Sequence, residues 1–330
     1  MAQILTIDSS TGRALGRAVE ALARGEPIGL PTETVYGLAA DATNAEAITR
    51  IYETKDRPRF NPLISHMSGL DMARRHAVFN PLAERLANAF WPGALTLVLP
   101  LAPDSDIHAL ATAGLPSVAV RVPTGFAADV IAAFGKPLAA PSANRSGRIS
   151  PTTAQHVADD IGDRIGLILD AGPCAVGVES TIVEVTDSGL RLLRPGGVTA
   201  EAIEAETGLR LSRQHSDPGQ PLVAPGMMAS HYAPAAQVRL DAERVWPGEV
   251  ALTFAARPMA GLEDARLVLD LSPAGDLREA AANLFDYLKR ADSSGAEIIA
   301  VASIPGAGLG EAINDRLRRA AAPRPATHAR

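Results

Sequence analysis

The sequence is poor in features that mark secreted and membrane proteins. It has one cysteine, Cys174, which excludes an internal disulfide framework and suits a reducing cytoplasm, where we expect the protein to work. No apolar run reaches the roughly 18 residues of a membrane span, so we expect no membrane partner. The N-terminus, Met1-Ala2-Gln3-Ile4-Leu5, lacks a basic segment followed by an apolar one, so we expect no signal peptide.

Positive charge and aromatic residues are also scarce. The chain has 31 Lys and Arg against 37 Asp and Glu, a formal net charge of −6. This balance argues against a protein that grips nucleic acid through a broad basic surface, although it leaves room for a local basic pocket. Aromatic residues make up only 4%, so the cores must be built from Ala, Leu, Val and Ile.

Several motifs for metals and nucleotides are missing. The sequence contains no GxxxxGK phosphate loop, no HExxH and no CxxC, so a zinc site is not expected. Gly306-Ala307-Gly308-Leu309-Gly310 resembles the start of a dinucleotide fingerprint, but its next glycine is misplaced. We therefore interpret it as a turn that leads into a helix.

The length and the pattern of apolar segments predict two α/β domains. A chain of 330 residues exceeds the size at which a single core usually stops growing. Strands alternate with helices up to residue 209 but are not strictly interleaved, which predicts a mixed, twisted sheet. The segment 210–236 is rich in proline and glycine and is predicted to be a linker, and 237–330 is predicted to be a small doubly wound α/β domain.

Small polar residues follow one predicted strand at its end. The apolar run Pro137–Ala140 stops at Pro141-Ser142-Ala143-Asn144-Arg145-Ser146-Gly147, and Ser150-Pro151-Thr152-Thr153 then begins a predicted helix. In α/β proteins such a turn lies at the rim of the sheet, where anionic ligands bind. The alternative is a plain strand–turn–helix joint.

Cations also stand at the ends of predicted elements. Lys55 and Arg57 share a loop that prolines stiffen, and a lysine beside an arginine suits a polyphosphate. Arg121 and Arg194 each end a strand, and Ser180 begins another. Each feature alone has an ordinary alternative, such as a solvated charge pair or an internal ion pair. Together they predict one pocket for anions.

These stretches carry a family resemblance. PTETVYGL, KxRPxxNPL followed by His66, WPGxLTLVL, PSANxSG with SPT after it, GxESTIV and RPGG occur in this order. With Pro225-Gly226-Met227 and His231-Tyr232-Ala233-Pro234, they resemble the YrdC-like family, in its long two-domain branch of threonylcarbamoyl-AMP synthases. The linker departs from the family pattern at Met228-Ala229-Ser230. The resemblance implies a twisted mixed open sheet with a large cationic cleft and a small Rossmann-like C-terminal domain.

The resemblance also implies a reaction. L-Threonine, bicarbonate or CO₂, and ATP would give L-threonylcarbamoyladenylate and pyrophosphate, which is the work of a nucleotidyltransferase. The product would feed a downstream tRNA threonylcarbamoyl-transferase complex, which modifies the base next to the anticodon of tRNAs that read ANN codons, with weak or no direct tRNA binding. Mg²⁺ is expected to ride on the triphosphate, because no carboxylate cluster offers it a separate site.

The family motifs assign roles to particular positions, and the linker with Tyr232 is the candidate lid. The implied residues are Lys55, Arg57, Ser142 and Asn144 for catalysis; Arg57, Asn61, Ser117, Ser142, Ser150, Arg194 and Tyr232 for ATP; and Thr34, His66, Arg121, the backbone at Ala140, and Ser180 for threonine.

Two other functions remain open at this stage. A non-catalytic RNA-binding protein could use the same cationic cavity to grip phosphates, although the acidic total and the few aromatic residues weigh against it. A carbamoyl-transfer domain acting on carbamoyl phosphate is the other, but larger relatives of that type carry acylphosphatase and zinc-binding segments, which are not seen here.

Overall fold

The structure is a computed structural model that describes residues 1–7, 11–58, 60–213 and 231–323. The chain divides into two compact units. The first comprises Met1–Ser146 and Pro151–Met227, and the second comprises Gly147–Ser150 and Met228–Arg330. Among the described residues, no helix combines the length and the apolar character needed to cross a membrane.

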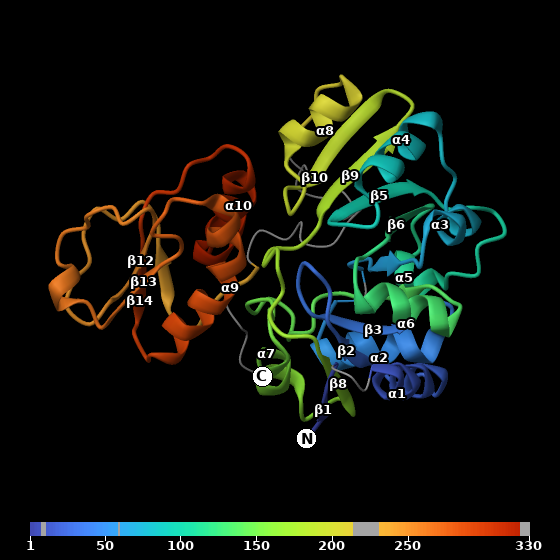
Figure 1. Ribbon diagram of the computed structural model, residues 1–330, viewed down its shortest axis with the longest axis horizontal. Coiled ribbons are helices and arrows are strands. Elements are labelled where there is room, and N and C mark those ends of the chain that lie inside the picture. Colours follow the sequence, from blue (N-terminus) through green and yellow to red (C-terminus); the bar gives the residue numbers. More distant parts are fainter. Residues whose placement is uncertain (8–10, 59, 214–230, 324–330) are drawn as a thin grey trace. The chain divides into compact units, whose positions relative to one another are not determined.

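The first unit is built on a ten-stranded mixed sheet. Figure 1 shows helices such as α1, α2 and α6 beside its strands. The strand order is β1-β8-β2-β3-β7-β4-β6-β5-β9-β10, and both parallel and antiparallel neighbours occur, for example β4 with β6 and β5 with β6. This confirms the predicted mixed α/β sheet. The strands are β1 (Gln3–Thr6), β2 (Ile28–Leu30), β3 (Gly37–Asp41), β4 (Ile64–His66), β5 (Leu95–Pro100), β6 (Ser117–Arg121), β7 (Leu138–Ala139), β8 (Leu167–Asp170), β9 (Thr181–Thr186) and β10 (Gly189–Arg194).

Several helices of the first unit begin at capping side chains. Asn44 accepts hydrogen bonds from the N–H groups of Glu46 and Ala47, and Asn80 accepts one from Ala83 with Pro81 at the first helical position. Thr153 caps the helix that we expected to begin at Ser150–Thr153. The helices are α1 (Thr11–Ala23), α2 (Ala45–Lys55), α3 (Leu70–His76), α4 (Pro81–Phe90), α5 (Ala109–Thr112), α6 (Phe126–Phe134), α7 (Ala154–Ile161) and α8 (Ala200–Thr207).

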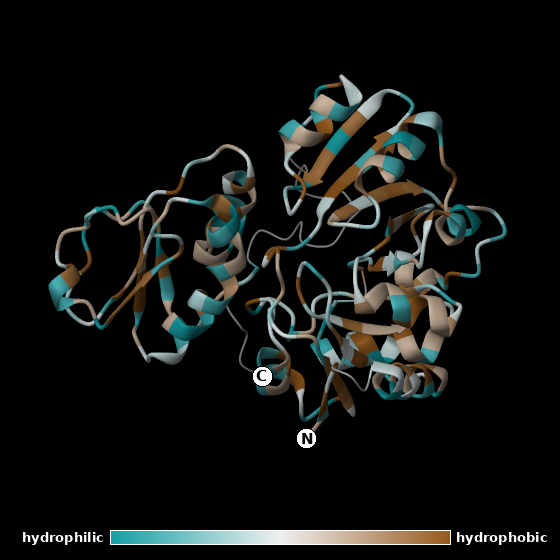
Figure 2. Ribbon diagram, viewed as in Figure 1, coloured by the Kyte–Doolittle hydropathy of each residue, from teal (hydrophilic) through white to brown (hydrophobic). Residues whose placement is uncertain are grey.

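The central strands have two buried faces, one that packs into the large apolar core and one that carries polar side chains. Successive side chains of a strand point to opposite faces, and the register pairs Leu97 with Val120 and with Val183. These three belong to the large core, which also includes buried side chains of α1, α2, α4 and α6. Figure 2 shows how strongly hydrophobic β5, β9 and β10 are. The opposite face carries the candidate site.

The second unit is a small parallel α/β domain. Its sheet has the order β11-β14-β12-β13, and Figure 1 shows α9 and α10 side by side against it. Gly308 ends the predicted turn and α10 starts at the next residue, with no side-chain cap. The elements are β11 (Gln237–Arg239), β12 (Val250–Thr253), η1 (Leu262–Asp264), β13 (Leu267–Asp270), α9 (Leu277–Ser293), β14 (Ile298–Val301) and α10 (Leu309–Ala321).

Candidate active site

The candidate site lies on the face of the first sheet that is opposite the large core. His66 pairs with Arg121, and Thr96 and Arg194 each pair with Ile182, so these side chains share one face. The apolar residues between them, Ile64, Val98, Ala119 and Ile182, form a separate buried cluster with Leu193 packed against it. The face therefore has a small apolar floor surrounded by cations, hydroxyls and an imidazole.

Arg121, at the end of β6, is held from three sides. Its side chain is 4% exposed, and its Nε donates to the carbonyl of Gly93 at 3.0 Å. Nη1 donates to Thr34 Oγ1 at 2.9 Å, and Nη2 donates to Glu33 Oε1 at 2.6 Å. The structure thus joins two predicted threonine-site residues, Arg121 and Thr34, and adds Glu33, which the prediction missed.

A tight turn presents Glu33 and Thr34. Thr32 Oγ1 donates to the carbonyl of Val35 at 2.6 Å and accepts the N–H of Thr34, which closes the turn on itself. The Glu33 carbonyl accepts the N–H of Val176, and its Oε2 accepts the N–H of Thr124 at 3.3 Å. The PTET segment therefore holds its carboxylate in a fixed place beside Arg121.

His66, at the end of β4, is buried and uncharged. Its burial in the first place, and then the nearby Arg121 cation, lower the His66 pKa to about 3. Nδ1 lies 3.3 Å from the carbonyl of Ile64. A neutral imidazole can offer a hydrogen bond to a ligand without adding another positive charge to this face.

Lys55 reaches the PSANxSG segment from the end of α2. Asp56 ends that helix in the left-handed region, at φ 51°, and the Lys55 carbonyl accepts the N–H of Ser146. Lys55 Nζ donates to the carbonyl of Ser142 at 2.5 Å and to that of Asn144. Burial above all, and then the neighbouring Arg57, hold the Lys55 pKa well below its usual range.

Arg57 and Asn61 are buried in the loop after α2. Arg59 of the same loop lies outside the described residues. Arg57 donates to the carbonyl of Pro62 at 3.0 Å through Nη2 and to that of Asn61 at 3.4 Å through Nε. The Asn61 side chain is fully buried, and among the described residues its Nδ2 and Oδ1 have no hydrogen-bond partner. Buried amides are normally paired, so this amide is suited to a ligand.

The PSANxSG segment is fixed by backbone hydrogen bonds. Ser142 forms a bridge with Gly37, and Ala143 N–H donates to the carbonyl of Tyr36 at 2.8 Å. Ala140 N–H is donated to the carbonyl of Ile64 at 3.1 Å, so only the Ala140 carbonyl could meet a ligand. This refines the predicted role of the backbone at Ala140.

Ser180 and Arg194 form a third group with Thr96. Arg194 donates to the Ser180 carbonyl through Nε at 3.2 Å and Nη2 at 2.8 Å, and Ser180 Oγ lies 2.8 Å from Thr96 Oγ1. The RPGG glycines permit this approach, because a Cβ on Gly196 would lie 2.3 Å from the Glu179 carbonyl. Thr96 was not predicted, although its place in the LTLVL strand could have indicated it.

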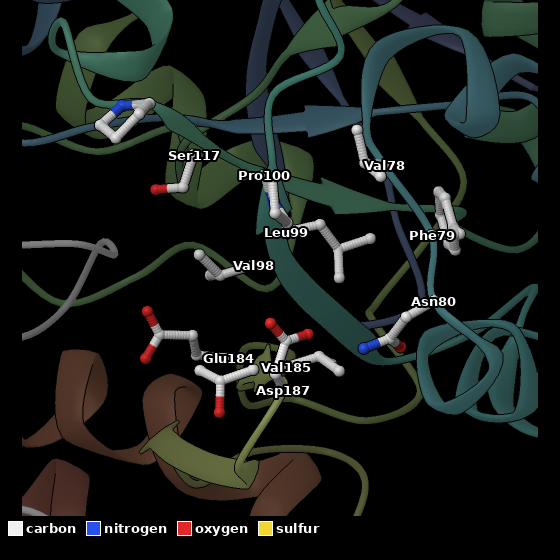
Figure 3. Close-up of a pocket in the computed structure, with 12 residues that line it drawn as sticks. Val78, Phe79, Asn80, Val98, Leu99, Pro100, Ser117, Glu184, Val185 and Asp187 are labelled. Carbon is white, nitrogen blue, oxygen red and sulfur yellow. The ribbon is translucent and has the colours of Figure 1, made fainter.

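Ser117 begins β6 and lies on the same face as Arg121, at the other end of the strand. It lines a cavity of about 460 Å³ with Val98, Leu99, Phe79 and Glu184 (Figure 3). Glu184 is paired with Arg191, whose Nε lies 2.6 Å from its Oε2. Ser117 is the single predicted site residue in the lining of this cavity among the described residues.

The two remaining predicted residues, Ser150 and Tyr232, fall in the second unit. Both are buried. Tyr232 adopts φ 61°, and its ring lies 5.4 Å from that of Phe285 and 5.3 Å from the Arg316 guanidinium. The predicted linker residues 214–230 lie outside the described part of the chain. In that described part, no group of three or more His, Cys, Asp or Glu could hold a metal ion.

The sequence matches two family models. Residues 20–196 match the Sua5–YciO–YrdC model, which is described as telomere recombination, and residues 198–322 match a model described as threonylcarbamoyl-AMP synthase, C-terminal domain. The chain belongs to the Sua5–YciO–YrdC family. This confirms the resemblance on which the expected site rests.

Relatives of the same length extend the match to both units. A Bacillus subtilis protein named threonylcarbamoyl-AMP synthase is 40% identical over 329 residues, which are 95% of this chain and 94% of that protein. A Pyrococcus abyssi protein of the same name is 40% identical over 90% of each chain. The crystal structure of P. abyssi Sua5 complexed with L-threonine is similar with a TM-score of 0.86 at 36% identity, over 97% of this chain and 98% of that one.

Proposed function

We propose that this protein is a nucleotidyltransferase that makes L-threonylcarbamoyladenylate and pyrophosphate from L-threonine, bicarbonate or CO₂, and ATP. The observation that carries the proposal is the shared face of the first sheet, where His66 pairs with the buried Arg121 and Ser180 accepts hydrogen bonds from the buried Arg194. The full-length relatives named threonylcarbamoyl-AMP synthase, and the structure of one homologue with L-threonine, support the choice of substrates.

The chemistry needs positioning and charge neutralisation more than covalent help from the protein. The threonine amine adds to CO₂ and loses a proton, which gives a carbamate. A carbamate oxygen then attacks the α-phosphorus of ATP, the bond from that phosphorus to the bridging oxygen breaks, and pyrophosphate leaves. Arg121 is our candidate partner for the threonine carboxylate, with Thr34, His66, Ser180 and the Ala140 carbonyl around the rest of the amino acid.

The phosphates would be held by the second group of residues. Lys55 and Arg57 are buried basic side chains, and bound phosphates would raise the Lys55 pKa again because opposite charge favours the charged form. Mg²⁺ would arrive with the triphosphate and neutralise part of its charge. The proposed set for catalysis and ATP is Lys55, Arg57, Asn61, Ser117, Ser142, Asn144, Ser150, Arg194 and Tyr232.

The product is proposed to pass to a tRNA threonylcarbamoyl-transferase. A labelling experiment tests the first step: the protein is incubated with ATP, Mg²⁺, labelled bicarbonate and each amino acid in turn. We expect a labelled adenylate and pyrophosphate with threonine. Absence of a labelled adenylate with any amino acid would refute the proposal, and tight, salt-sensitive tRNA binding without adenylate would favour the RNA-binding alternative.

A further inference from the structure

Glu33 contacts Arg121, which is also the proposed partner of the substrate's own carboxylate. Its side chain is 14% exposed, and Oε1 lies 2.6 Å from Arg121 Nη2. Its other oxygen accepts the N–H of Thr124, and its main-chain carbonyl accepts that of Val176. The carboxylate is thus anchored at both oxygens before any substrate binds.

Arg121 has N–H groups beyond those used in its three contacts. An arginine has five N–H groups, and the bonds to Gly93, Thr34 and Glu33 use three of them. Because Nε is occupied, a second carboxylate could make a bidentate contact only through the two Nη atoms. One N–H remains on each of these atoms beyond the three bonds.

The placement of Glu33 also has an electrostatic consequence. Arg121 is almost fully buried, and burying an unpaired charge is costly. Removing the carboxylate would leave the guanidinium with its bonds to Gly93 and Thr34 and would take the acceptor from Nη2, so its orientation would be less tightly fixed. With Glu33 present, the guanidinium is both charged and fixed in one orientation.

We propose that Glu33 is a positioning residue that holds the Arg121 guanidinium with its Nη1–Nη2 edge presented to the carboxylate of the amino-acid substrate. This role rests on the proposed function, in which Arg121 meets the threonine carboxylate. Glu33 acts through Arg121 and does not itself touch the reacting atoms.

The test uses the full-length Glu33→Gln variant, which keeps the size of the side chain and removes its charge. Affinities for L-threonine and for threoninol, which carries a CH₂OH in place of the carboxylate, are measured by calorimetry, and KM is measured for threonine and ATP. We expect threonine binding to weaken about tenfold, the value of one charge-assisted hydrogen bond. Threoninol binding and the KM for ATP should not change.

A double-mutant cycle asks whether Glu33 works through Arg121. In an Arg121→Ala background, Glu33→Gln should have no further effect on threonine affinity. The matched control is Glu249→Gln in the second unit, because Glu249 is also buried and also accepts from an arginine, Arg239, and a backbone N–H, that of Trp246. Its loss should leave threonine affinity at the wild-type value.

Several results would overturn the inference. Unchanged threonine affinity in Glu33→Gln would do so, and tighter binding would mean that Glu33 competes with the substrate. Equal losses for threonine, threoninol and ATP would indicate a merely structural role. If Glu33→Gln does not fold, Glu33→Asp is used, and it must weaken threonine binding selectively. Failure of the proposed function is distinguishable, because the wild-type protein would then form no threonine-dependent adenylate.

Discussion

The two faces of β5, β6 and β9 differ in what they bury. On one face Leu97, Val120 and Val183 join the large core. On the other, one residue away along the same strands, stand Thr96 and Arg121, with Ser180 immediately before β9. Both faces are buried, so exposure does not distinguish them. The difference is that the second face carries polar and charged side chains, which form hydrogen bonds with one another and with turns and strand ends.

Within this single sheet, one face contributes mainly to stability and the other carries the residues proposed for the chemistry. Apolar burial on the core face stabilises the fold without directional contacts. Arg194 on the site face and Lys55 at the end of α2 donate hydrogen bonds to main-chain carbonyls, which fix these basic side chains in place. Substitutions on the two faces should therefore affect different measurements.

The largest effect is expected for Lys55→Ala on the site side. Loss of the buried lysine that we propose contacts the phosphates should lower the rate of threonine-dependent adenylate formation roughly 100- to 1,000-fold, because the charge that develops during phosphoryl transfer would lose its partner. Pyrophosphate release measures the rate, and circular dichroism checks the fold. Lys136→Ala is the control, since Lys136 is half exposed and pairs with Asp41 at 3.1 Å. A Lys55→Ala protein with full activity would contradict the assignment.

The next largest effect is expected on the free energy of unfolding, when neighbouring residues of β5 on the two faces are each replaced by alanine. Leu97→Ala, on the core face, should lower the free energy of unfolding by about 2–5 kcal/mol because it opens a cavity in the large core. Val98→Ala removes fewer atoms from the small cluster on the site face and should cost less. Urea denaturation measures both. If Val98→Ala were the more damaging change, the small cluster would be contributing more to stability than the large core does at this strand.

A smaller effect is expected for Arg121→Ala. Removing the proposed partner of the threonine carboxylate should raise KM for threonine roughly 100-fold, as loss of a bidentate charged contact would, with little change in KM for ATP. Initial rates with each substrate varied in turn give the two values. Equal increases in both would show that Arg121 supports the site as a whole and does not recognise the amino acid.

Much of this organisation could be predicted from local patterns. Asn44, Asn80 and Pro81 placed two helices of the first unit, and the apolar segments placed most of its strands. Strand β3 was missed, because Gly37-Leu38-Ala39-Ala40-Asp41 has neither β-branched residues nor alternation. The family motifs provided the candidate site residues, and the strand register then showed that His66 and Arg121 are direct neighbours.

Other features depend on contacts between distant segments. Glu33 and Arg121 are 88 positions apart in the chain, and Thr96 and Ser180 are 84 apart, so no local pattern links them. A distant contact also narrows the role predicted for the backbone at Ala140, because its N–H donates to the carbonyl of Ile64 and its carbonyl is the group left for a ligand. Periodicity predicts which face a residue occupies, whereas partners across the sheet depend on topology.

The smallest effect is expected when the pH is varied, because the buried His66 should not change its charge near neutral pH and threonine affinity should hardly change. Its folded-state pKa of about 3 lies below the usual value of 6.5, so the unfolded chain binds more protons between these two values. The stability from the neutral imidazole is therefore complete above pH 6.5 and is lost as pH falls towards 3. Threonine affinity should stay constant from pH 6 to 8, measured by calorimetry, with the His66→Gln variant as the reference. A tenfold change in affinity near pH 6.5 that is absent from this variant would show that the imidazole titrates, and that this face is less sealed from water than the core face.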